Sequence, residues 1–395
     1  NYSVQLWEVD TLYYPEELVE EIRNRSDIIS VIGSYIKLQK KGSNHMGLCP
    51  FHNEKTPSFS VSPSKQMYHC FGCGASGNVF TFLMEYENYT FVEALKFLAE
   101  RAGVALPEQE YSEEAKKKAD LRTRLLEVNK QAAKYFYYQL KSNHGQAAYK
   151  YLTGRGLTED TIKKFGLGYS NKFSDDLYQY LKNLNYEDEF LKQSGLVTID
   201  EKRGASDKFW NRVMFPIMDV NQRVIGFGGR VMGDGMPKYL NTPETLLFDK
   251  SRTLYGLNIA KNSRETDLLI CEGYMDVIAL HQAGFTNAVA ALGTAFTAQH
   301  ANLMKRYTRE ALLTFDSDQA GTQATLRAIP ILKDAGLSVK VVSMQPYKDP
   351  DEFIKALGAE AYRQRMAEAK NSFFYEIDVL QKQYDMQDPE HKTRF

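Results

Sequence analysis

Short apolar runs alternate with helical stretches over residues 268–344 of the chain. The runs LLIC, AVAAL, ALLTF and VKVVSM are separated by segments whose apolar residues recur at helical spacing. Strands that alternate with helices in this way predict a βαβαβαβ unit, in which helices cover both faces of a parallel sheet.

The N-terminal part of the chain shows a different pattern. Residues 15–36 and 78–104 each have helical apolar spacing; Pro15 favours the start of the first helix, and Gly33 and Gly103 lie near the two ends. Between them, HMGLCPF, PSFSVSP and QMYHCF alternate polar and apolar residues, which predicts three short strands joined by turns.

The other segments complete a coarse domain plan. Residues 1–14 show no clean period and are interpreted as an arm, and residues 107–118 are charged and poor in apolar residues, which predicts a linker. Residues 119–195 are mostly helical in pattern, residues 206–238 contain the strand-like runs VMFPIMDV and VIGFGG, and the chain from residue 351 onward is again helical in pattern. The sequence therefore predicts a multidomain protein with α+β and α/β parts.

Length and composition exclude several classes of protein. A chain of 395 residues predicts two or three domains, and 43% hydrophobic and 25% charged residues are typical of an ordinary globular protein. Four cysteines are too few for a secreted disulfide scaffold, and neither a signal peptide nor an apolar run of about 18 residues is present. We therefore expect a cytoplasmic protein without membrane association.

The charge is unevenly distributed. The formal net charge is −1, but residues 36–70 contain five lysines against one glutamate, and residues 202–238 contain seven basic residues against three aspartates. Each segment taken alone is equally consistent with a solvated loop. Together they are candidate surfaces for a polyanion.

Four residues have the spacing of a metal site. Cys49-x2-His52 is followed after seventeen residues by Cys70-x2-Cys73, which is the arrangement of a structural, tetrahedral Zn²⁺ site. A disulfide would leave one of the three cysteines over and would not explain His52. A catalytic zinc ion would need an open coordination position, whereas four protein ligands close the shell.

The residues around these ligands suggest a use for such a module. Lys55, Lys65, Tyr68 and Phe71 could contact phosphates and stack on bases of a single strand. The alternative is that the aromatic side chains pack on the small core of the module.

Acidic residues follow the ends of three predicted strands, where ligands bind in open α/β sheets. The set comprises Glu272 and Asp276 after LLIC, Asp316 and Asp318 after ALLTF, and Asp349 and Asp351 after VKVVSM. Carboxylates gathered in this way repel one another unless a cation lies among them, and oxygen ligands suit Mg²⁺ or Mn²⁺. Two or more such ions predict phosphoryl or nucleotidyl transfer.

Any one of these acids could instead cap a helix, and Asp318 is an equally good candidate for a cap. The set of Glu272, Asp316 and Asp349 on separate strand ends is hard to explain by capping. Cys271, at the end of LLIC, is predicted to be a small buried hydrophobic residue and not a nucleophile.

The Gly-rich run GFGGRVMGDG is weak evidence for a phosphate-binding loop. The Walker A pattern G-x-x-x-x-G-K-[ST] occurs nowhere in the chain, so an ATP-driven helicase is not expected.

Long motifs resemble those of the bacterial DNA primases of the DnaG type, from about Pro15 to the end of the chain. The motifs are GLCPFHNEKTPSFSVSPSKQMYHCFGCGASGNVFTFLM, RVMFPIMDVNQRVIGFGGRV, PKYLNTPET, LLICEGYMDVIAL, FDSDQAG and KDPDEF. The resemblance implies an N-terminal zinc ribbon with flanking helices, a mixed α/β basic subdomain, a Toprim subdomain with a parallel sheet, and C-terminal helices. The boundaries expected are 1–106, a linker at 107–118, then 119–262, 263–350 and 351–395.

The resemblance also implies roles for individual residues. Glu272, Asp316 and Asp318 are expected to be catalytic, and divalent-metal ligands are expected at Glu272, Asp276, Asp316, Asp318, Asp349 and Asp351, beside one structural zinc ion. Template and nucleotide phosphates are expected at Arg155, Arg212, Arg230 and Lys238, although each could be a solvated cation.

These features favour an enzyme that copies single-stranded DNA into short RNA primers from ribonucleoside triphosphates. Strand cleavage at the same acids, as in topoisomerases and some nucleases, and a zinc module that only binds single strands are the alternatives. Members of the family usually carry a further C-terminal domain that docks the replicative helicase, and this chain stops at Phe395. The helicase is therefore an expected partner of the full-length protein only.

Overall fold

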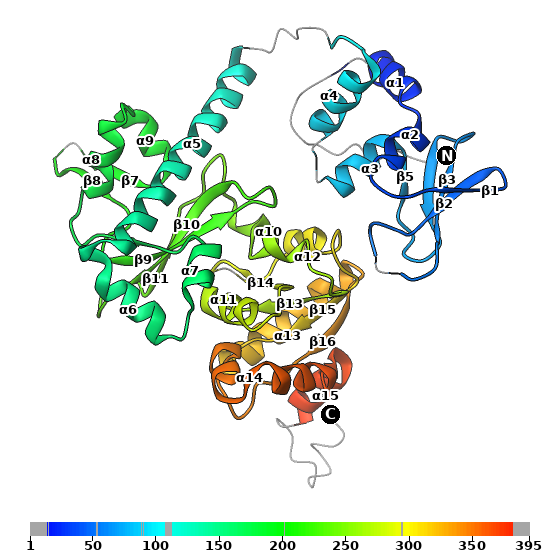
Figure 1. Cartoon of the computed structure of the whole chain (residues 1–395). Coiled ribbons are helices and arrows are strands. Elements are labelled where there is room, and N and C mark those ends of the chain that lie inside the picture. The colour runs from blue at the N-terminus through cyan, green and yellow to red at the C-terminus, as the bar shows by residue number, and fades with distance from the viewer. Residues whose placement is uncertain are drawn as a thin grey trace. The chain divides into compact units, whose positions relative to one another are not determined.

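The computed structural model divides into two compact units, Asn1–Ser112 and Glu113–Phe395 (Figure 1). It describes residues 14, 16–52, 54–87, 89, 91–106, 113–200, 202–293 and 295–381. Of the predicted arm, residues 1–14, only Tyr14 is among the described residues, and Pro15 lies outside them as well. The division falls within the predicted linker 107–118, but its last six residues already belong to helix α5.

Unit 1 contains a five-stranded antiparallel sheet whose strands follow one another in chain order. The strands are β1 (Gln39–Lys41), β2 (Asn44–Gly47), β3 (Phe59–Ser62), β4 (Met67–Cys70) and β5 (Ser76–Gly77). The three predicted strands correspond to β2, β3 and β4. Phe59, Val61 and Tyr68 are buried on one face of the sheet, where they form a core with the helices of the unit.

Four helices cover this core: α1 (Glu16–Arg25), α2 (Ile28–Gly33), α3 (Val79–Tyr86) and α4 (Phe91–Ala102). Each of the two long helices predicted from the sequence is therefore broken in two. The first break has a local cause, because the side chain of Asp27 accepts a hydrogen bond from Ser30 N and caps α2. Gly103 has φ +63° after α4, as expected of a residue that ends a helix.

The first part of unit 2 is an antiparallel sheet packed against a long helix. The sheet has the order β11 (Tyr239–Asn241), β10 (Val224–Val231), β9 (Arg212–Met218), β6 (Gly168–Ser170), and β7 (Val197–Asp200) pairs separately with β8 (Gly204–Asp207). The helices are α5 (Glu113–Lys141), α6 (Gln146–Gly154), α7 (Glu159–Lys164), α8 (Asp176–Asn183) and α9 (Asp188–Ser194). Phe136 of α5 packs on Phe227 of β10, with ring centroids 5.3 Å apart.

The second part of unit 2 contains the predicted parallel sheet. Its order is β12 (Leu254–Tyr255), β14 (Ala288–Ala291), β13 (Asp267–Cys271), β15 (Glu310–Leu313), β16 (Ser338–Val341) and β17 (Lys370–Asn371). The four central strands are parallel and the two edge strands are antiparallel. Its helices are α10 (Leu257–Ala260), α11 (Tyr274–Gln282), α12 (Ala298–Met304), α13 (Gln319–Asp334), α14 (Pro350–Ala367) and α15 (Ser372–Gln381). The predicted α/β architecture is confirmed.

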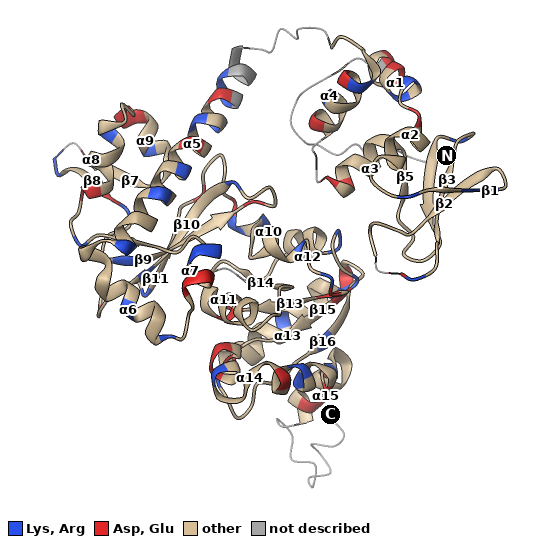
Figure 2. Ribbon diagram, in the orientation of Figure 1, with Lys and Arg blue, Asp and Glu red and all other residues tan. Residues whose placement is uncertain are grey.

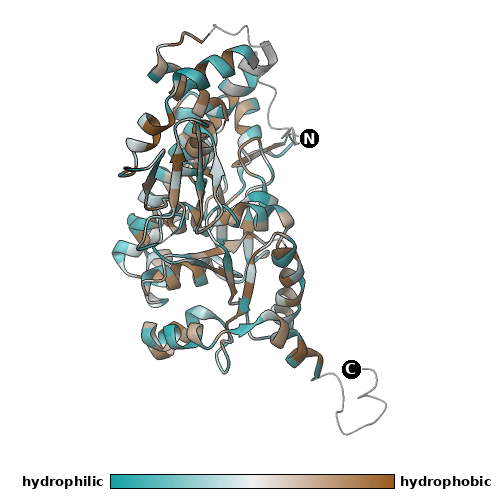
Figure 3. Cartoon of the chain, turned by 90° about the vertical axis from the view of Figure 1, so that its right-hand side faces the viewer, coloured by the Kyte–Doolittle hydropathy of each residue, from teal (hydrophilic) through white to brown (hydrophobic). Residues whose placement is uncertain are grey.

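Both faces of this sheet are buried. Leu269 and Cys271 point into a core shared with α11 and α14, whereas Leu268 and Ile270 point into a second core shared with α12 and α13. Hydrophobic and hydrophilic residues are interspersed along the helices of the chain (Figure 3), and α11 is buried from Tyr274 to His281. Cys271 is fully buried, as predicted.

The two larger sheets of unit 2 are joined through α11. Tyr274, the first residue of α11, stacks on Phe215 of β9 with ring centroids 4.9 Å apart. A Cβ atom on Gly228 of β10 would lie 2.4 Å from the ring of Tyr274, so only glycine permits this approach. The basic subdomain is thereby packed against the first turn after Glu272.

The region from residue 351 onward differs from the all-helical prediction. The short strand β17 lies between α14 and α15, and the backbone at Gly358 (φ 81°) leaves the helical conformation within α14. Residues 382–395 lie outside the described part of the chain. None of the helices described is long and apolar enough to cross a membrane.

A buried histidine makes the stability of unit 2 depend on pH. His281 bonds Ala288 O through Nε2 (2.9 Å), and burial lowers the pKa of His281 to about 4. The unfolded chain binds this proton near pH 6.5 and the folded chain only near pH 4, so stability falls as the pH drops between these values, by up to roughly 3 kcal/mol. Above pH 6.5 the contribution is constant.

We expect the free energy of opening of β13 and β14, measured by hydrogen exchange on the full chain, to fall between pH 7 and pH 5. The fall should be smaller in His281→Gln, which cannot titrate. Equal falls in the two proteins would exclude His281 as the cause.

Candidate functional site

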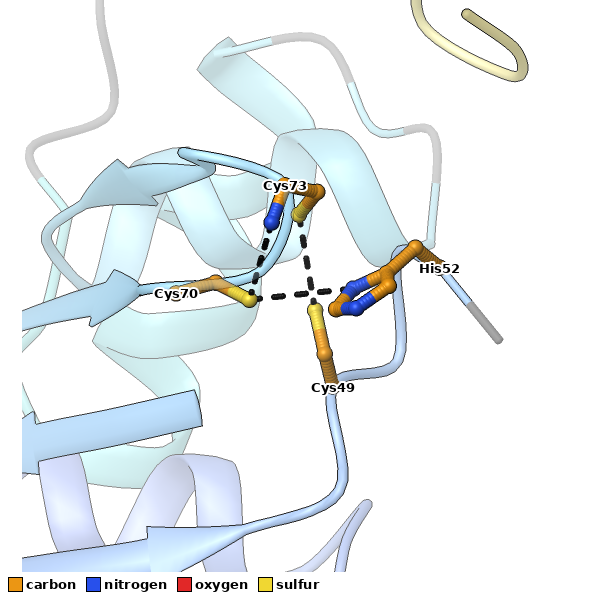
Figure 4. A group of neighbouring side chains, drawn as sticks. All are labelled: Cys49, His52, Cys70 and Cys73. Atoms are coloured by element: carbon orange, nitrogen blue, oxygen red, sulfur yellow. Dashed lines mark hydrogen bonds between the residues drawn. The ribbon is translucent and has the colours of Figure 1, made fainter. Parts of the chain in front are cut away.

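The four predicted zinc ligands converge in unit 1 (Figure 4). Cys49 and His52 lie on the loop after β2, and Cys70 and Cys73 lie at the end of β4 and in the turn after it. One ligand atom from each of the four residues lies within 4.8 Å of all the others. The Cys49 and Cys73 Sγ atoms are 3.8 Å apart, and Cys70 Sγ is 3.7 Å from His52 Nδ1.

These distances fit one tetrahedral zinc ion. Zn–S bonds of about 2.3 Å place two sulfurs of a tetrahedron about 3.8 Å apart, and a disulfide would need about 2.05 Å. Backbone amides support the sulfurs, since Phe51 N donates to Cys49 Sγ (3.4 Å) and Cys73 N to Cys70 Sγ (3.5 Å). Burial raises the pKa of the Cys49 thiol, so the thiolate needs the charge of a cation.

Glu54 supports this cage and was not singled out from the sequence. Its Oε1 accepts hydrogen bonds from Cys49 N (2.7 Å) and Ser58 N (3.0 Å), and its Oε2 lies 3.3 Å from His52 Nε2. Burial opposes ionisation of Glu54, but the hydrogen bonds prevail and lower its pKa. A carboxylate on the far nitrogen of a ligating histidine fixes the ring and strengthens the ligand.

One of the four residues considered for contact with a single strand beside the zinc site, Tyr68, lies in the core of unit 1. Tyr68 is 1% exposed and its hydroxyl donates to Glu85 Oε2 (2.9 Å), so of the two alternatives this ring packs on the core of the module and does not stack on bases. The period of two along β4 explains this, because Tyr68 shares the inner face with Cys70. Phe71 is 74% exposed, and Lys55 and Lys65 are exposed as well.

The six acids occupy the carboxyl ends of the central parallel strands. Glu272 follows β13, Asp276 lies in the first turn of α11, Asp316 and Asp318 follow β15, and Asp349 and Asp351 open α14 after β16. Glu272 Oε1 accepts a hydrogen bond from Asp316 N (2.9 Å), which links two neighbouring strand ends directly.

Three of the acids also cap helices: Asp318, for which a cap was an equally good prediction, and Asp276 and Asp349, whereas Glu272 and Asp316 do not. The bonds run from Gly273 N to Asp276 Oδ2 (3.1 Å), from Gly321 N to Asp318 Oδ1 (2.9 Å) and from Glu352 N to Asp349 Oδ1 (2.8 Å). Each cap uses one carboxylate oxygen. For the residues that the structure describes, the other oxygen of each cap and Oε2 of Glu272 have no hydrogen-bond partner, so capping leaves them free for a cation.

The electrostatics of this cluster indicate a missing positive charge. Burial and the neighbouring carboxylates, led by Asp349, raise the pKa of Asp276 to about 8. Partial enclosure and nearby carboxylates also raise the pKa of Asp316 and of Glu272, although the tip of Glu272 reaches solvent. A bound cation stabilises the ionised form of carboxylates that raise one another's pKa in this way, and an all-oxygen donor set suits Mg²⁺ or Mn²⁺.

Close backbone approach brings α13 against these acids. A Cβ atom on Gly321 would lie 2.1 Å from Asp316 O and 2.8 Å from Glu272 Oε1. Glycine in the run FDSDQAG is therefore required for packing and not only as a helix residue.

The four predicted phosphate-binding residues have different environments. Arg212 is 6% exposed and donates through Nη1 to Gly229 O (3.0 Å) and Pro237 O (2.9 Å), so it holds the loop that carries Lys238, and its phosphate contact stays a prediction. Lys238 is exposed, and the guanidinium of Arg230 lies 4.3 Å from the ring centroid of Tyr151. In Figure 2, Lys and Arg mark the ribbon at β9 and β11, and Asp and Glu mark it at α14.

Two lysines near the acids escaped the sequence analysis. Lys348 Nζ lies 3.6 Å from Asp316 Oδ2, and Lys355 Nζ lies 2.6 Å from Asp351 Oδ2. Arg155 Nη2 also contacts Asp351 Oδ2 (2.5 Å). Asp351 and Lys355 are one helical turn apart, and this spacing could have predicted the second pair from the sequence. Beside these acids, a cavity of about 500 Å³ is lined by Asp318, Lys348 and Glu352 among others.

Comparison with known proteins gives three successive family matches. Residues 14–114 match the CHC2 zinc finger, residues 135–261 the N-terminal domain of the DNA primase catalytic core, and residues 269–354 a Toprim-like domain. A DNA primase of Clostridium acetobutylicum is 41% identical over 390 residues, which are 98% of this chain and 64% of that protein. The chain thus spans less than two thirds of this relative.

Solved structures are similar as well. The zinc-binding and RNA polymerase domains of the Aquifex aeolicus primase match with a TM-score of 0.61 and 36% identity, over 95% of this chain and 90% of that one. A DnaG primase catalytic domain bound to single-stranded DNA matches with a TM-score of 0.63 and 35% identity, over 70% of this chain and 88% of that one. The CHC2 match and the Cys3His group agree on one structural zinc ion, and the Toprim match agrees with a divalent ion at the acids.

Zinc removal should unfold unit 1 and spare unit 2. We expect a zinc chelator to abolish amide protection of β2–β4, because metal binding contributes to the folding of such small modules, and to leave β13–β15 protected. Hydrogen exchange on the full chain measures both at once. Retained protection of β2–β4 without zinc would contradict a structural role of the ion.

Glu54→Gln should weaken zinc binding by roughly 10- to 100-fold, the usual effect of losing a carboxylate that supports a ligand. Competition with a chromogenic chelator measures the affinity. Glu17→Gln, an exposed change on α1, is the matched control and should bind zinc like the wild type.

Proposed function

Because the chain belongs to the bacterial DnaG-type DNA primases, we propose that it is a DNA-dependent RNA polymerase that makes short primers on single-stranded DNA from ribonucleoside triphosphates. The observation that carries this proposal is the edge of the parallel sheet, where each of the six acids has a carboxylate oxygen held by a backbone amide or a cation. A set of carboxylate oxygens held in advance in this way suits nucleotidyl transfer.

The residues proposed to hold divalent ions are Glu272, Asp276, Asp316, Asp318, Asp349 and Asp351. Bound ions would lower the pKa of the attacking hydroxyl and stabilise charge on the leaving pyrophosphate. The chain itself contributes fixed geometry. The cap bonds to Asp318 and Asp349 and the bond from Asp316 N to Glu272 hold one oxygen of each carboxylate before any ligand arrives.

Arg155, Arg230 and Lys238 are proposed to bind phosphates of the nucleotide and the template. Tyr151 supports Arg230 by a cation–π contact, which limits the directions that the guanidinium can take. Arg212 fixes the loop before Lys238 through Pro237 O, so it also contributes to phosphate binding indirectly. Lys348 lies beside Asp316 and neutralises part of the acidic edge.

Unit 1 is proposed to engage the single-stranded template through the exposed face of its sheet. On β4, Met67 and His69 point away from the core, and His69 meets Phe71 edge-on with centroids 4.9 Å apart. Lys41 of β1 and Lys65 of the β3–β4 turn are exposed and supply positive charge. An exposed aromatic ring with lysines around it suits base stacking combined with phosphate contact.

The proposed activity also bears on the cellular location of the protein and on its partners. We place it in the cytoplasm, as the sparse cysteines lead us to expect, and the replicative helicase stays a predicted partner of the full-length protein.

Glu272→Gln should abolish primer synthesis, with a loss of about 10³-fold or more, since the substitution removes a metal-binding charge from the site. The assay is single-stranded template with labelled ribonucleotides and Mg²⁺ or Mn²⁺. Glu360→Gln, at an exposed position of α14, is the control and should keep full activity. Primer made equally by Glu272→Gln, or relaxation of supercoiled DNA without nucleotides, would refute the proposal.

Phe71→Ala should weaken binding of single-stranded DNA by roughly 5- to 100-fold, because one stacked base contributes about 1–3 kcal/mol. Fluorescence anisotropy of a labelled oligonucleotide measures this. Met84→Ala removes a different exposed apolar side chain of unit 1 and should leave binding unchanged. Equal affinity of the Phe71→Ala variant and the wild type would remove Phe71 from the template surface.

A further inference from the structure

The carboxylate of Asp351 is shared between two cations. Asp351 is 2% exposed, and its Oδ2 accepts hydrogen bonds from Arg155 Nη2 (2.5 Å) and from Lys355 Nζ (2.6 Å). Lys355 lies one helical turn later on α14, whereas Arg155 comes from the corner that follows α6. One negative charge is thus held by one local and one distant positive charge.

Two further polar atoms of this cluster lack a partner. Oδ1 of Asp351 and Nε of Arg155 are buried, and neither finds a hydrogen bond within the described part of the chain. Buried polar atoms are almost always paired in native proteins. An unpaired buried acceptor therefore points to a cation, and an unpaired buried guanidinium nitrogen points to an anion.

Asp351 lies in the first turn of α14, two residues after the cap Asp349, at the acidic edge of the sheet. Besides burial, neighbouring carboxylates that include Asp351 raise the pKa of Asp276, so Asp351 lies within electrostatic reach of the proposed metal ligands. Only Oδ1 is available there, because Oδ2 is occupied by the two cations.

Arg155 can turn toward an anion only through movement of its side chain, because its backbone is held in place. Gln282 of α11 bonds Gly156 O through Nε2 (2.8 Å) and Thr158 N through Oε1 (2.8 Å), which fixes the backbone after Arg155. The side chain of Arg155 is 38% exposed, so its guanidinium can reach a ligand in solvent. Arg155 and Arg230 both lie within electrostatic reach of Tyr239, and a triphosphate would attract the two together.

We propose that Lys355 is a positioning residue that keeps Oδ2 of Asp351 paired when Arg155 turns to the triphosphate of the incoming ribonucleotide, so that Oδ1 stays aimed at the divalent ion. This inference rests on the proposed function. With Lys355 present, the departure of Arg155 does not leave a buried carboxylate without a counter-charge. Without Lys355, Arg155 is the sole partner of Asp351 among the described residues and is retained by it.

We therefore expect removal of Lys355 to affect the binding of ATP and the binding of Mn²⁺ differently. Lys355→Met should weaken binding of ATP by about tenfold, because binding must break a buried ion pair. The same variant should bind Mn²⁺ without nucleotide as tightly as the wild type or more tightly, because one competing cation has gone. Loss of structure would weaken both, so the opposite directions identify positioning.

The experiment measures Mn²⁺ binding by electron paramagnetic resonance of the free ion, and ATP binding by calorimetry in the presence of Mn²⁺, on the full chain. Lys355→Arg should restore ATP affinity to within about twofold of the wild type, since it keeps the charge. Lys333→Met is the matched control: Lys333 pairs with Glu376 at 3.1 Å and is 43% exposed, against 40% for Lys355. In primer synthesis, Lys355→Met should raise KM for the ribonucleotide more than it lowers kcat.

Unchanged ATP affinity in Lys355→Met overturns the inference, and so does a parallel loss of ATP and Mn²⁺ affinity. Failure of Lys355→Arg to restore ATP binding also overturns it. If the wild type binds ATP and makes primer while Lys355→Met matches it, only this inference falls. If the wild type binds no ribonucleotide, the proposed function falls and the inference falls with it.

Discussion

Repulsion among carboxylates at one edge of a parallel sheet is the constraint on which unit 2 depends. The topology requires it, because the carboxyl ends of β13, β15 and β16 meet at that edge and each is followed by acids. Burial and, after it, repulsion from the neighbouring carboxylates raise the pKa of Asp276 to about 8. The surrounding structure offsets it with backbone amides and with the side chains of Arg155, Lys348 and Lys355. The amides are placed by helix starts, and the cations by packing between parts of the chain that are far apart in sequence.

Unit 1 meets a different constraint. Its strands are two to four residues long, so the sheet alone has few ladder bonds to hold it. The structure compensates with an aromatic core and with the Cys3His cage, which ties the loop after β2 to the end of β4. Glu54 belongs to both, because it holds the backbone of Cys49 and Ser58 while it faces the ring of His52. This core covers the inner face of the sheet, so the outer face is the one accessible to a partner.

The features that sequence could predict are those with a local period or spacing. The βαβ alternation, the zinc tetrad and the placement of acids after strands all depend on residues that are near one another in the chain, and the structure contains each. The interruptions of the long N-terminal helices were missed, because the apolar period continues across the cap at Asp27. The burial of Arg212 and the pairing of Arg155 with Asp351 were missed for another reason. Both depend on contacts between residues 17 to 196 positions apart, about which no local pattern carries information.

Helix capping and metal binding are not competing explanations for the acids in this sheet. A cap engages one carboxylate oxygen with a backbone amide, and a divalent ion needs an oxygen whose direction is fixed. Asp318 and Asp349 satisfy the first condition with one oxygen and can satisfy the second with the other. The same geometry explains why these acids lie where strands turn into helices: that is where amide groups are unpaired and can hold a carboxylate in place. At Asp351 and at Asp316 cations replace the amide, namely Arg155 and Lys355 at the first and Lys348 at the second, so an anionic ligand can influence the fixed oxygen of these two acids.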